Sequence, residues 1–519
     1  MILGDNVIGK SKIVLFDSNI KYAGSPLALL AITKLFDVDK YDIRIITRTE
    51  HPDYENEILR QCEGAICFGV TCISGTPTKT ALNVSRMVKQ NYPALPIIWG
   101  GWQAITLPDL TLENPNIDYL CIGQGERTFY EFVNMLETND FSNIAKIAGL
   151  SYKNHGIVIH NLPRESEDLN LFPDFDLRLI NWEKYLEVVD YGKKVLRIVT
   201  SYGCAYRCAF CCEPFNTKGR WRALSSERII TFLRNLYKLV EFDGLAIVDS
   251  NFFTNEQRVV DFCKGLIKNN FSIRLGAVNG RANELSKYKE TTWELLQRAG
   301  FYQILIGAES ASNETLKLIN KGATVEETIL VAQLCKKHNI QSLVVSTILG
   351  LPIASYFGGG KNEAFDQEFR ELFMFYKDLR AIEPHTLLLA FVYTPLPSTP
   401  MYKKAINLGF IPPNTLEAWS DYELTNIHIN WISKKNITKV LMLNFVCGTM
   451  SIDYSHMIKA LPLIIKIIAI PIISIAKCIC GLRLKYNFLS FPIDMKSFYF
   501  SSMIFKKINR VFRMVNIGD

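Results

Sequence analysis

The stretch Ser201-Tyr-Gly-Cys-Ala-Tyr-Arg-Cys-Ala-Phe-Cys211 is the part of the chain from which the fold can be worked out. It follows the apolar run Val195-Leu-Arg-Ile-Val-Thr200, which reads as a strand, and it spaces three cysteines as C-x3-C-x2-C. A structural zinc site needs four ligands, and Cys212 is a poor fourth because adjacent side chains on extended backbone point to opposite sides. A four-iron cluster held by three cysteines leaves one iron open. The spacing therefore favours a cluster over a zinc site or three unrelated buried thiols.

This loop resembles the signature of the radical S-adenosylmethionine (SAM) superfamily, C-x3-C-x-aromatic-C, with Phe210 as the aromatic residue. The resemblance implies a [4Fe-4S] cluster on Cys204, Cys208 and Cys211. It implies that the amino and carboxylate groups of SAM chelate the open iron, and that reductive cleavage of SAM yields a 5′-deoxyadenosyl radical. It also implies an external electron donor such as flavodoxin or ferredoxin.

The length and composition limit the classes of protein to which the chain can belong. A chain of 519 residues with 48% hydrophobic and 21% charged residues predicts two or three packed domains. The net charge of +7 is modest, and no stretch interleaves basic and aromatic residues, so we expect no nucleic-acid partner. The cysteine count of 13 is odd, and the first ten residues do not resemble a signal peptide, so we expect reduced thiols and a cytoplasmic location.

The first 145 residues alternate short apolar runs with amphipathic ones. The predicted strands are 12–16, 42–46, 65–70, 96–99 and 119–122, with helical patterns between them, notably at 26–36 and 78–90. Continuous apolar strands that alternate with helices predict a doubly wound parallel sheet covered on both faces. Ligands of such sheets bind beyond the carboxyl ends of the strands.

Small and glycine-rich residues follow the third, fourth and fifth of these strands. They are Thr71, Ser74 and Gly75; Gly100, Gly101 and Trp102; and Gly123, Gly125 and Glu126. The set resembles the flavodoxin-like (Rossmann-type) cobalamin-binding domain that many radical SAM enzymes carry, which implies that these residues contact cobalamin. The match is incomplete at Gln103-Ala104 and Gln124, and the D-x-H-x-x-G motif is absent, so no histidine from that motif ligates the cobalt. The alternative is a flavodoxin-like sheet kept only as a scaffold.

Residues 146–195 read as a linker, and from 196 to 410 the pattern changes to strand–helix units. The predicted strands are 196–200, 244–249, 272–277, 303–307, 341–349 and 386–393, and the predicted helices are 226–240, 255–268, 291–298, 313–318 and 325–338. This order predicts a partial (β/α)6 barrel of the TIM type, in which chemistry gathers at the carboxyl ends of the strands.

Several strand ends resemble landmarks of the radical SAM barrel. Gly307-Ala-Glu-Ser310 resembles the fourth-strand Gly-x-Glu-Ser, and Ile348-Leu-Gly-Leu-Pro352 resembles the fifth-strand segment whose backbone packs on adenine. The resemblance implies SAM contacts from Phe210, Asp249, Arg281, Glu309, Ser310, Leu349 and Gly350. Alternatives stay open: Asp249 as a strand-end cap, Arg281 in a surface ion pair, and Glu309 as a buried partner of Arg281. Pro397-Ser-Thr-Pro400 resembles the closing Pro-Gly-Thr-Pro element, with serine in place of glycine.

Residues 411–519 predict a mainly helical segment that is apolar and basic. Its most apolar stretch, 460–480, nears the length of a membrane span but is interrupted by Lys466, Lys477 and two prolines. Basic residues follow it, among them Arg483, Lys485, Lys496, Lys506, Lys507, Arg510 and Arg513. We expect a helix that covers the substrate side of the barrel; peripheral membrane contact is the alternative, and it would favour a lipid-like substrate.

Taken together, the resemblance covers residues 10–410 and implies a cobalamin-dependent radical SAM enzyme. The leading hypothesis is a methyltransferase acting on an unactivated carbon, in which one SAM methylates cob(I)alamin and another yields the adenosyl radical. The alternatives are cyclisation or rearrangement with the same cofactors and, from another class, a cobalamin or redox sensor without catalysis. The motifs do not name a catalytic residue, and the substrate stays open among small molecules, lipids and peptides.

Overall fold

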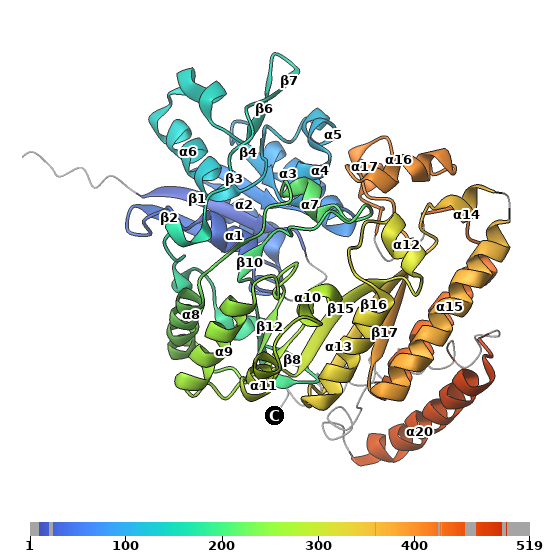
Figure 1. The fold of residues 1–519 in the computed structure, drawn as a ribbon. Coiled ribbons are helices and arrows are strands. Elements are labelled where there is room, and N and C mark those ends of the chain that lie inside the picture. The colour runs from blue at the N-terminus through green and yellow to red at the C-terminus, as the bar shows by residue number, and fades with distance from the viewer. Residues whose placement is uncertain are drawn as a thin grey trace, which may run out of the picture. The chain divides into compact units, whose positions relative to one another are not determined.

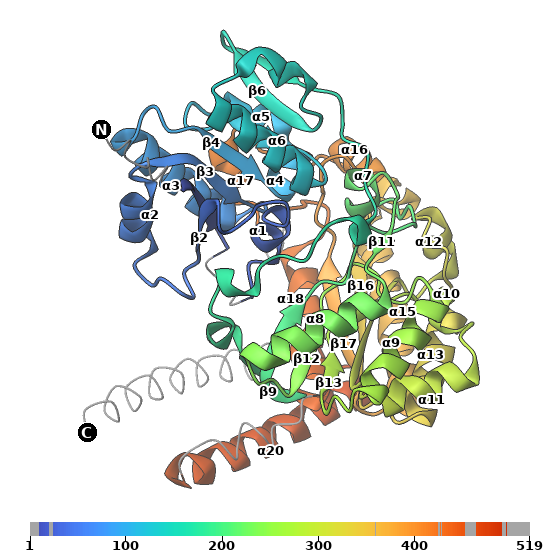
Figure 2. The same cartoon turned by 90° about the vertical axis from the view of Figure 1, so that its left-hand side faces the viewer.

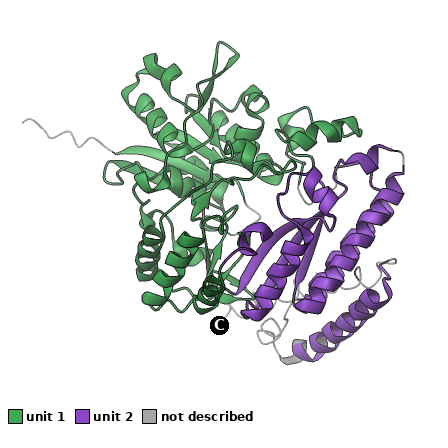
Figure 3. Cartoon of the chain, in the orientation of Figure 1, with its two compact units in different colours: residues 1–279, 289–301, 394–428 green, residues 280–288, 302–393, 429–519 purple. Residues whose placement is uncertain are grey.

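The structure is a computed structural model that describes residues 10–19, 24–358, 360–423, 426, 428–451, 463–489 and 495. The chain forms two compact units (Figure 3). The first unit contains residues 1–279, 289–301 and 394–428, and the second contains residues 280–288, 302–393 and 429–519.

The first unit begins with a seven-stranded sheet in the order β2-β1-β3-β4-β5-β6-β7 (Figure 1). Its strands are β1 (Ser11–Asp17), β2 (Tyr41–Ile46), β3 (Ala65–Thr71), β4 (Ile97–Gly100), β5 (Tyr119–Cys121), β6 (Leu150–Asn154) and β7 (Ile157–His160). The first five run parallel and match the five predicted strands. Their apolar runs are continuous because both faces of the sheet are covered.

Helices lie on both faces of this sheet (Figure 2). Helices α1 (Leu27–Ile32) and α6 (Gly125–Thr138) pack on each other, and so do α2 (Tyr54–Cys62) and α3 (Thr76–Asn91). The large buried residues between the sheet and α2 and α3 include Phe16, Phe68 and Trp99. The doubly wound arrangement predicted from the sequence is confirmed.

The expected linker contributes to the first sheet. Its residues 150–160 form the antiparallel hairpin β6–β7, which pairs with β5. Without this hairpin β5 would be an edge strand with unpaired backbone groups, and covering such an edge is a common way to prevent aggregation. The remainder contains short 3-10 helices and the strand β8 (Glu187–Val189).

A second sheet of the first unit has the order β13-β12-β9-β8. Strands β9 (Gly192–Ile198), β12 (Gly244–Ile247) and β13 (Arg274–Gly276) run parallel and match the first three predicted barrel strands. Helices α8 (Ser226–Leu239), α9 (Glu256–Lys268) and α11 (Glu290–Arg298) accompany them. The side chains of Ser225 and Asn255 cap α8 and α9 at their first turns, which explains where these helices begin.

The second unit contains β15, β16 and β17 of a sheet in the order β14-β15-β16-β17; of β14, only Gly280 is in this unit. Strands β15 (Gln303–Glu309), β16 (Ser342–Leu349) and β17 (Leu387–Val392) run parallel, match the last three predicted barrel strands, and pack with α13 (Val325–Lys337) and α15 (Lys361–Ile382) (Figure 1). The remaining elements of this sheet and its helices are β14 (Val278–Gly280), α10 (Ala282–Leu285), α12 (Asn313–Leu318), α14 (Ala354–Phe357), α18 (Lys434–Ser451) and α20 (Leu463–Tyr486). All six predicted strands of the partial barrel are therefore present, in chain order, with helical crossovers.

Helix α18 completes the outer edge of β17. The Asn444 amide group accepts a hydrogen bond from the Ala390 N–H and donates one to its C=O, both at 2.7 Å. One side chain thus satisfies both backbone groups as a neighbouring strand would. The described part of the carboxyl-terminal segment is mainly helical, as predicted, and no described helix combines the length and hydropathy needed to cross a bilayer.

Candidate active site

The three cysteines of the signature lie on a loop whose ends are joined. Strand β10 (Ser201–Tyr202) pairs antiparallel with β11 (Arg222–Ala223), so residues 203–221 form a closed loop between them. At its start Gly203 has φ +82°, and a Cβ atom there would lie 2.0 Å from the backbone oxygen of Arg220. Only glycine fits this position without moving the neighbouring backbone.

The three thiols differ in exposure. Cys208 is buried, whereas Cys204 and Cys211 are half-buried, and the Cys211 N–H donates to the Cys208 carbonyl at 3.2 Å. Burial raises the pKa of Cys211 to about 12, so cluster binding has to release a proton there. Among the described residues, no three His, Cys, Asp or Glu side chains are grouped so as to hold a metal ion. Thiols are the donors that iron–sulfur clusters take, and the cluster role of these cysteines stays a prediction.

Asp249 lies at the end of β12, fully buried beside the strand that leads into the cysteine loop. Its carboxylate accepts hydrogen bonds from Thr200 N–H, Thr200 Oγ1 and Ser201 Oγ, each at 2.6 Å. Arg258 of α9, which the sequence did not single out, donates to Thr200 Oγ1 at 2.7 Å and to the Leu224 carbonyl at 2.9 Å. Asp249 therefore fixes the start of the loop, and Arg258 connects its start with its end at Leu224. The SAM contact of Asp249 stays a prediction.

The predicted cobalamin residues that follow β3 and β4 come together at the carboxyl edge of the first sheet. Cys72 N–H donates to the Gly100 carbonyl at 3.0 Å, and Gln103 N–H donates to the Cys72 carbonyl at 3.1 Å. Gly101 has φ +87°, and a Cβ atom there would lie 2.6 Å from the Cys72 oxygen. Ser74 Oγ donates to Gln103 Oε1 at 2.7 Å, which ties the two loops together. Thr71, Gly75 and Trp102 flank these contacts at the ends of β3, α3 and α4 (Trp102–Thr106).

The third predicted element lies next to them, after β5. Gly123 has φ +86° and open space where a side chain would be, and Gly125 begins α6. Glu126 is buried, with Lys34 Nζ 3.9 Å from its carboxylate, and burial raises the pKa of Glu126. The loop therefore combines an open backbone with a carboxylate held inside the fold.

This edge of the sheet has hydrogen-bonding capacity that the described residues do not use. Asn19 Oδ1, Gln103 Nε2 and Gln124 Nε2 are buried and have no partner in the described part of the chain. They follow β1, β4 and β5 respectively. Buried polar atoms are seldom left unpaired, so a polar ligand that supplies donors and acceptors fits here. Cobalamin, with amide groups around its corrin ring, is such a ligand.

A segment from after the barrel also reaches this edge. We call residues 394–423, which contain α16 (Pro400–Asn407) and α17 (Leu416–Trp419), the closing segment. Thr76 Oγ1 donates to the Glu423 carboxylate, and a Cβ atom on Gly75 would lie 3.3 Å from the Tyr422 carbonyl oxygen. At its other end, Met401 N–H donates to the Ala209 carbonyl of the cysteine loop at 3.2 Å. Sequence reasoning missed the contact at Glu423, because only its position in the fold brings it to α3.

In the second unit, Glu309 ends β15 and is buried. Its Oε1 lies 2.8 Å from Lys321 Nζ, and its backbone adopts φ +67°. Arg281 donates to the Lys321 carbonyl and, at 3.3 Å, to Asn283 Oδ1. Lys321 is thus an ion-pair partner that the sequence did not indicate, since a lysine in the Asn320-Lys-Gly322 turn after α12 is ordinarily solvated.

The remaining predicted SAM residues are distributed over both units. Phe210 is half-buried in the cysteine loop of the first unit. Ser310 and Leu349 are buried in the second unit, where Ser310 Oγ accepts from Ser312 N–H at 3.2 Å. Gly350 follows β16 with φ +76°. The structure therefore places each of them at or beyond a strand end, and their contacts with SAM stay predictions.

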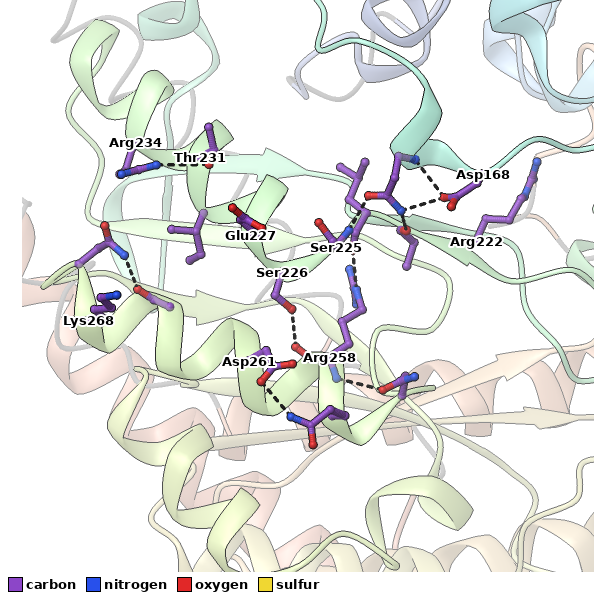
Figure 4. Close-up of a pocket in the computed structure, with 18 of the residues that line it drawn as sticks. Asp168, Arg222, Ser225, Ser226, Glu227, Thr231, Arg234, Arg258, Asp261 and Lys268 are labelled. Atoms are coloured by element: carbon purple, nitrogen blue, oxygen red, sulfur yellow. Dashed lines mark hydrogen bonds between the residues drawn. The ribbon is translucent and has the colours of Figure 1, made fainter.

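A cavity of about 1070 Å³ lies in the first unit along α8 and α9 (Figure 4). Charged residues of both signs line it, including Arg234, Lys268, Glu227 and Asp261. It contains none of the residues predicted to bind a cofactor, and we assign it no role.

Comparison with known proteins accounts for the order of these elements. Residues 14–133 match the sequence model of the B12 binding domain, and residues 198–355 match that of the Radical SAM superfamily. The chain belongs to the radical SAM proteins that carry a B12-binding domain. The fold class predicted from the sequence is confirmed by the same matches.

Curated relatives and solved structures of this family resemble the chain over much of its length. An uncharacterized methyltransferase of Pyrococcus horikoshii is 27% identical over 338 residues, which cover 63% of this chain and 70% of the relative. The anaerobic magnesium-protoporphyrin IX monomethyl ester cyclase of Synechocystis sp. is 26% identical over 328 residues, covering 61% of this chain and 63% of the relative. The chain thus spans about two thirds of these relatives.

Two solved structures share the fold. The cobalamin-dependent SAM radical enzyme OxsB, solved with aqua-cobalamin and SAM, superposes with a TM-score of 0.70 at 19% identity and covers 96% of this chain and 75% of its own. The radical SAM methyltransferase TsrM of Kitasatospora setae, solved with cobalamin and a [4Fe-4S] cluster, superposes with a TM-score of 0.60 at 18% identity, covering 77% and 75%.

Proposed function

We propose that this radical SAM protein is a cobalamin-dependent methyltransferase that acts on an unactivated carbon. The observation that carries the proposal is that one compact unit holds both the closed three-cysteine loop and a sheet edge with unused buried hydrogen-bonding atoms. The name of the Pyrococcus horikoshii relative and the methyltransferase TsrM support methyl transfer. The cyclase of Synechocystis sp. supports the alternative, a ring-forming reaction with the same cofactors.

The residues divide into groups that hold the three cofactors. In this proposal Cys204, Cys208 and Cys211 hold the cluster, and the loops after β3, β4 and β5 hold cobalamin. SAM is bound by Phe210, Asp249, Arg281, Glu309, Ser310, Leu349 and Gly350. When bound, the cluster, SAM and cobalamin supply the radical and methyl-transfer chemistry, which side chains by themselves cannot perform.

The chain's own contribution is to orient these groups. Asp249 and Arg258 fix the start of the cysteine loop through Thr200, and Lys321 fixes the carboxylate of Glu309 in a buried ion pair. A buried carboxylate held in one place is ready to accept a hydrogen bond from an ammonium or a ribose hydroxyl without rearranging.

Radical SAM enzymes need an external reductant, and we propose flavodoxin or ferredoxin for this one. The substrate class stays open among small molecules, lipids and peptides. A cytoplasmic location stays a proposal that rests on the odd number of cysteines.

The function is tested with anaerobically reconstituted protein, cobalamin, SAM and a strong reductant. S-adenosylhomocysteine and 5′-deoxyadenosine are quantified in the same reaction. We expect both products, and we expect Cys204→Ala to lose 5′-deoxyadenosine while Cys478→Ala, which changes an exposed cysteine of α20, does not.

The product pattern separates the alternatives. 5′-Deoxyadenosine without S-adenosylhomocysteine favours cyclisation or rearrangement over methyl transfer. If protein with a full iron content forms neither product, even with extracts that contain candidate substrates, the enzymatic proposal fails and the sensor hypothesis gains.

We also propose a peripheral contact between α20 and a lipid surface. The helix packs on α18 and exposes Ile467 (66%), Ile475 (59%) and Leu482 (51%), and its sequence contains lysines and an arginine but no acidic residue. Apolar side chains beside cations suit an anionic bilayer surface. Residues 460–462 of the predicted apolar stretch lie outside the described residues.

The lipid contact is measured by co-sedimentation with vesicles of phosphatidylglycerol or of phosphatidylcholine alone. We expect binding to the anionic vesicles that Ile467→Glu with Ile475→Glu reduces at least tenfold. The control Leu330→Glu, which changes an exposed leucine of α13, leaves binding unchanged. Equal binding by both variants would rule the α20 contact out.

A further inference from the structure

The turn that follows β16, residues 349–352, is held by two side chains from elsewhere in the second unit. The Gly350 N–H donates to Glu368 Oε2 at 3.0 Å, and the Gly350 carbonyl accepts from Trp431 Nε1 at 3.0 Å. Both hydrogen-bonding groups of one residue are therefore satisfied by side chains rather than by a neighbouring strand. We call residues 349–352 the Gly350 turn.

Glu368 approaches the Gly350 turn from α15. Its Oε2 also accepts a hydrogen bond from the Tyr356 hydroxyl at 2.6 Å, and Tyr356 is fully buried. Its other oxygen, Oε1, is buried and has no partner in the described part of the chain. A carboxyl group placed where solvent is excluded costs stability, which favours a role for Glu368 beyond packing.

Trp431, which contacts the carbonyl group of Gly350, lies on the chain that leads into α18. It is 3% exposed. Its neighbour Ile432 lies so close that a Cβ atom on Gly350 would be 2.2 Å from Ile432 Cδ1. The left-handed φ of +76° favours glycine at this position, and a larger residue would also have to displace the end of the Ile432 side chain.

We propose that Glu368 and Trp431 are positioning residues for SAM, which hold the Gly350 turn in the conformation that binds the adenosyl group. The inference rests on the proposed function, since it takes the Gly350 turn as part of the SAM site. A ligand that packs on backbone gains affinity when that backbone is already ordered, because binding then does not have to order it. Loss of one such hydrogen bond corresponds to about tenfold in affinity.

A purely structural role predicts a different result. If Glu368 only stabilised the fold, its substitution would lower the melting temperature and leave the SAM affinity of the folded protein unchanged. Glutamine keeps an oxygen that accepts from Gly350 N–H, so Glu368→Gln serves as the conservative rescue. Glu371, one turn further along α15, accepts a hydrogen bond from Gln367 Nε2 at 3.1 Å, so Glu371→Ala is the matched control for loss of a carboxylate on the same helix.

The test measures the dissociation constant of SAM by isothermal titration calorimetry on cluster-loaded protein, together with the melting temperature. We expect Glu368→Ala and Trp431→Phe each to weaken SAM binding about tenfold, with Glu368→Gln and Glu371→Ala within twofold of wild type. If Glu368→Ala does not fold, the dissociation constants of SAM for Trp431→Phe and Glu368→Gln are compared instead. The inference then requires Trp431→Phe to bind SAM about tenfold more weakly than Glu368→Gln.

Two outcomes would overturn the inference, and they differ in what else they affect. Wild-type affinity in folded Glu368→Ala and Trp431→Phe rejects the positioning role and leaves the proposed function intact. No SAM binding by cluster-loaded wild-type protein rejects the proposed function and the positioning role together.

Discussion

Single residues with left-handed backbone mark both parts of the candidate site. Gly203 opens the cysteine loop at φ +82°, and Gly350 forms the turn after β16 at φ +76°. Glu309 adopts φ +67° although it carries a side chain, which costs an L-residue about 1–2 kcal/mol. Its carboxylate forms a buried ion pair with Lys321. Strain kept at a residue of this kind is a common mark of a binding site.

Substitution of Gly203 tests how much the close contact between residues 203 and 220 contributes to the stability of the cysteine loop. We expect Gly203→Ala to lower the free energy of unfolding by about 2–4 kcal/mol, because a methyl group meets the Arg220 oxygen in addition to the left-handed strain. Chemical denaturation and the iron content after reconstitution are the measurements. Gly219→Ala is the control: its φ is +67°, but the nearest atom to its Cβ would be 3.6 Å away, so only about 1 kcal/mol is expected. Equal losses in the two variants would show that the Arg220 contact is unimportant.

Between elements, the closing segment links the cysteine loop and the first sheet within one unit. Met401 contacts the loop at Ala209, Leu416 is buried in the core beneath α3, and Asp421 pairs with Lys79 at 3.7 Å. The closing segment therefore stabilises the amino-terminal end of α3, beside the loop predicted to contact cobalamin.

Removing the contact between the closing segment and α3 should weaken the binding of cobalamin. We expect Glu423→Ala to weaken cobalamin binding about tenfold. Thr76, the first residue of α3, loses the hydrogen bond that it donates to Glu423, and the Ser74–Gly75 loop before it becomes less ordered. Titration of apoprotein with aqua-cobalamin, followed by absorbance, measures it without turnover. Glu417→Ala removes a more distant, exposed contact of the same segment, with Asn114, and should stay within twofold. If Glu417→Ala weakened cobalamin binding as much as Glu423→Ala, the effect could not be assigned to the contact between Glu423 and Thr76.

At the scale of the whole molecule, residues proposed to bind cofactors occur in both compact units. The cysteine loop and the cobalamin edge belong to one unit, and Gln124 Oε1, which accepts from Arg222 Nη1 at 2.7 Å, connects the third cobalamin loop to β11. Arg281, Glu309, Ser310, Leu349 and Gly350 belong to the other.

The stability of the molecule should depend on pH through Glu368. Burial raises the pKa of Glu368 to about 7, above its ordinary value of 4.5. The folded state therefore favours the protonated carboxyl group, and its contribution is present below pH 4.5 and lost as pH rises to about 7. We expect Glu368→Gln to flatten this slope and to raise the free energy of unfolding at pH 8 by at most about 3 kcal/mol. Urea denaturation at several pH values measures it, and an unchanged slope would contradict the assignment to Glu368.

Local sequence predicted the architecture well. Strands β1 to β5 and the six barrel strands were predicted because continuous apolar runs and helical spacing are properties of neighbouring residues. The signature cysteines and the glycines after β3, β4 and β5 were found for the same reason. The hairpin β6–β7 and helix α15 differ from the prediction, because the short runs of β6 and β7 resemble a linker and the helical spacing of α15 does not stand out in the local sequence.

What the sequence by itself determined is the set of elements, their order and the residue types at each strand end. The tertiary structure alone decided which side chains meet there: Lys321 beside Glu309, Glu368 and Trp431 at Gly350, and Glu423 at Thr76, 347 positions away in the chain. Secondary structure depends on local spacing, whereas such contacts arise when distant elements pack, and a charged residue that becomes buried by packing looks in the sequence like any solvated one.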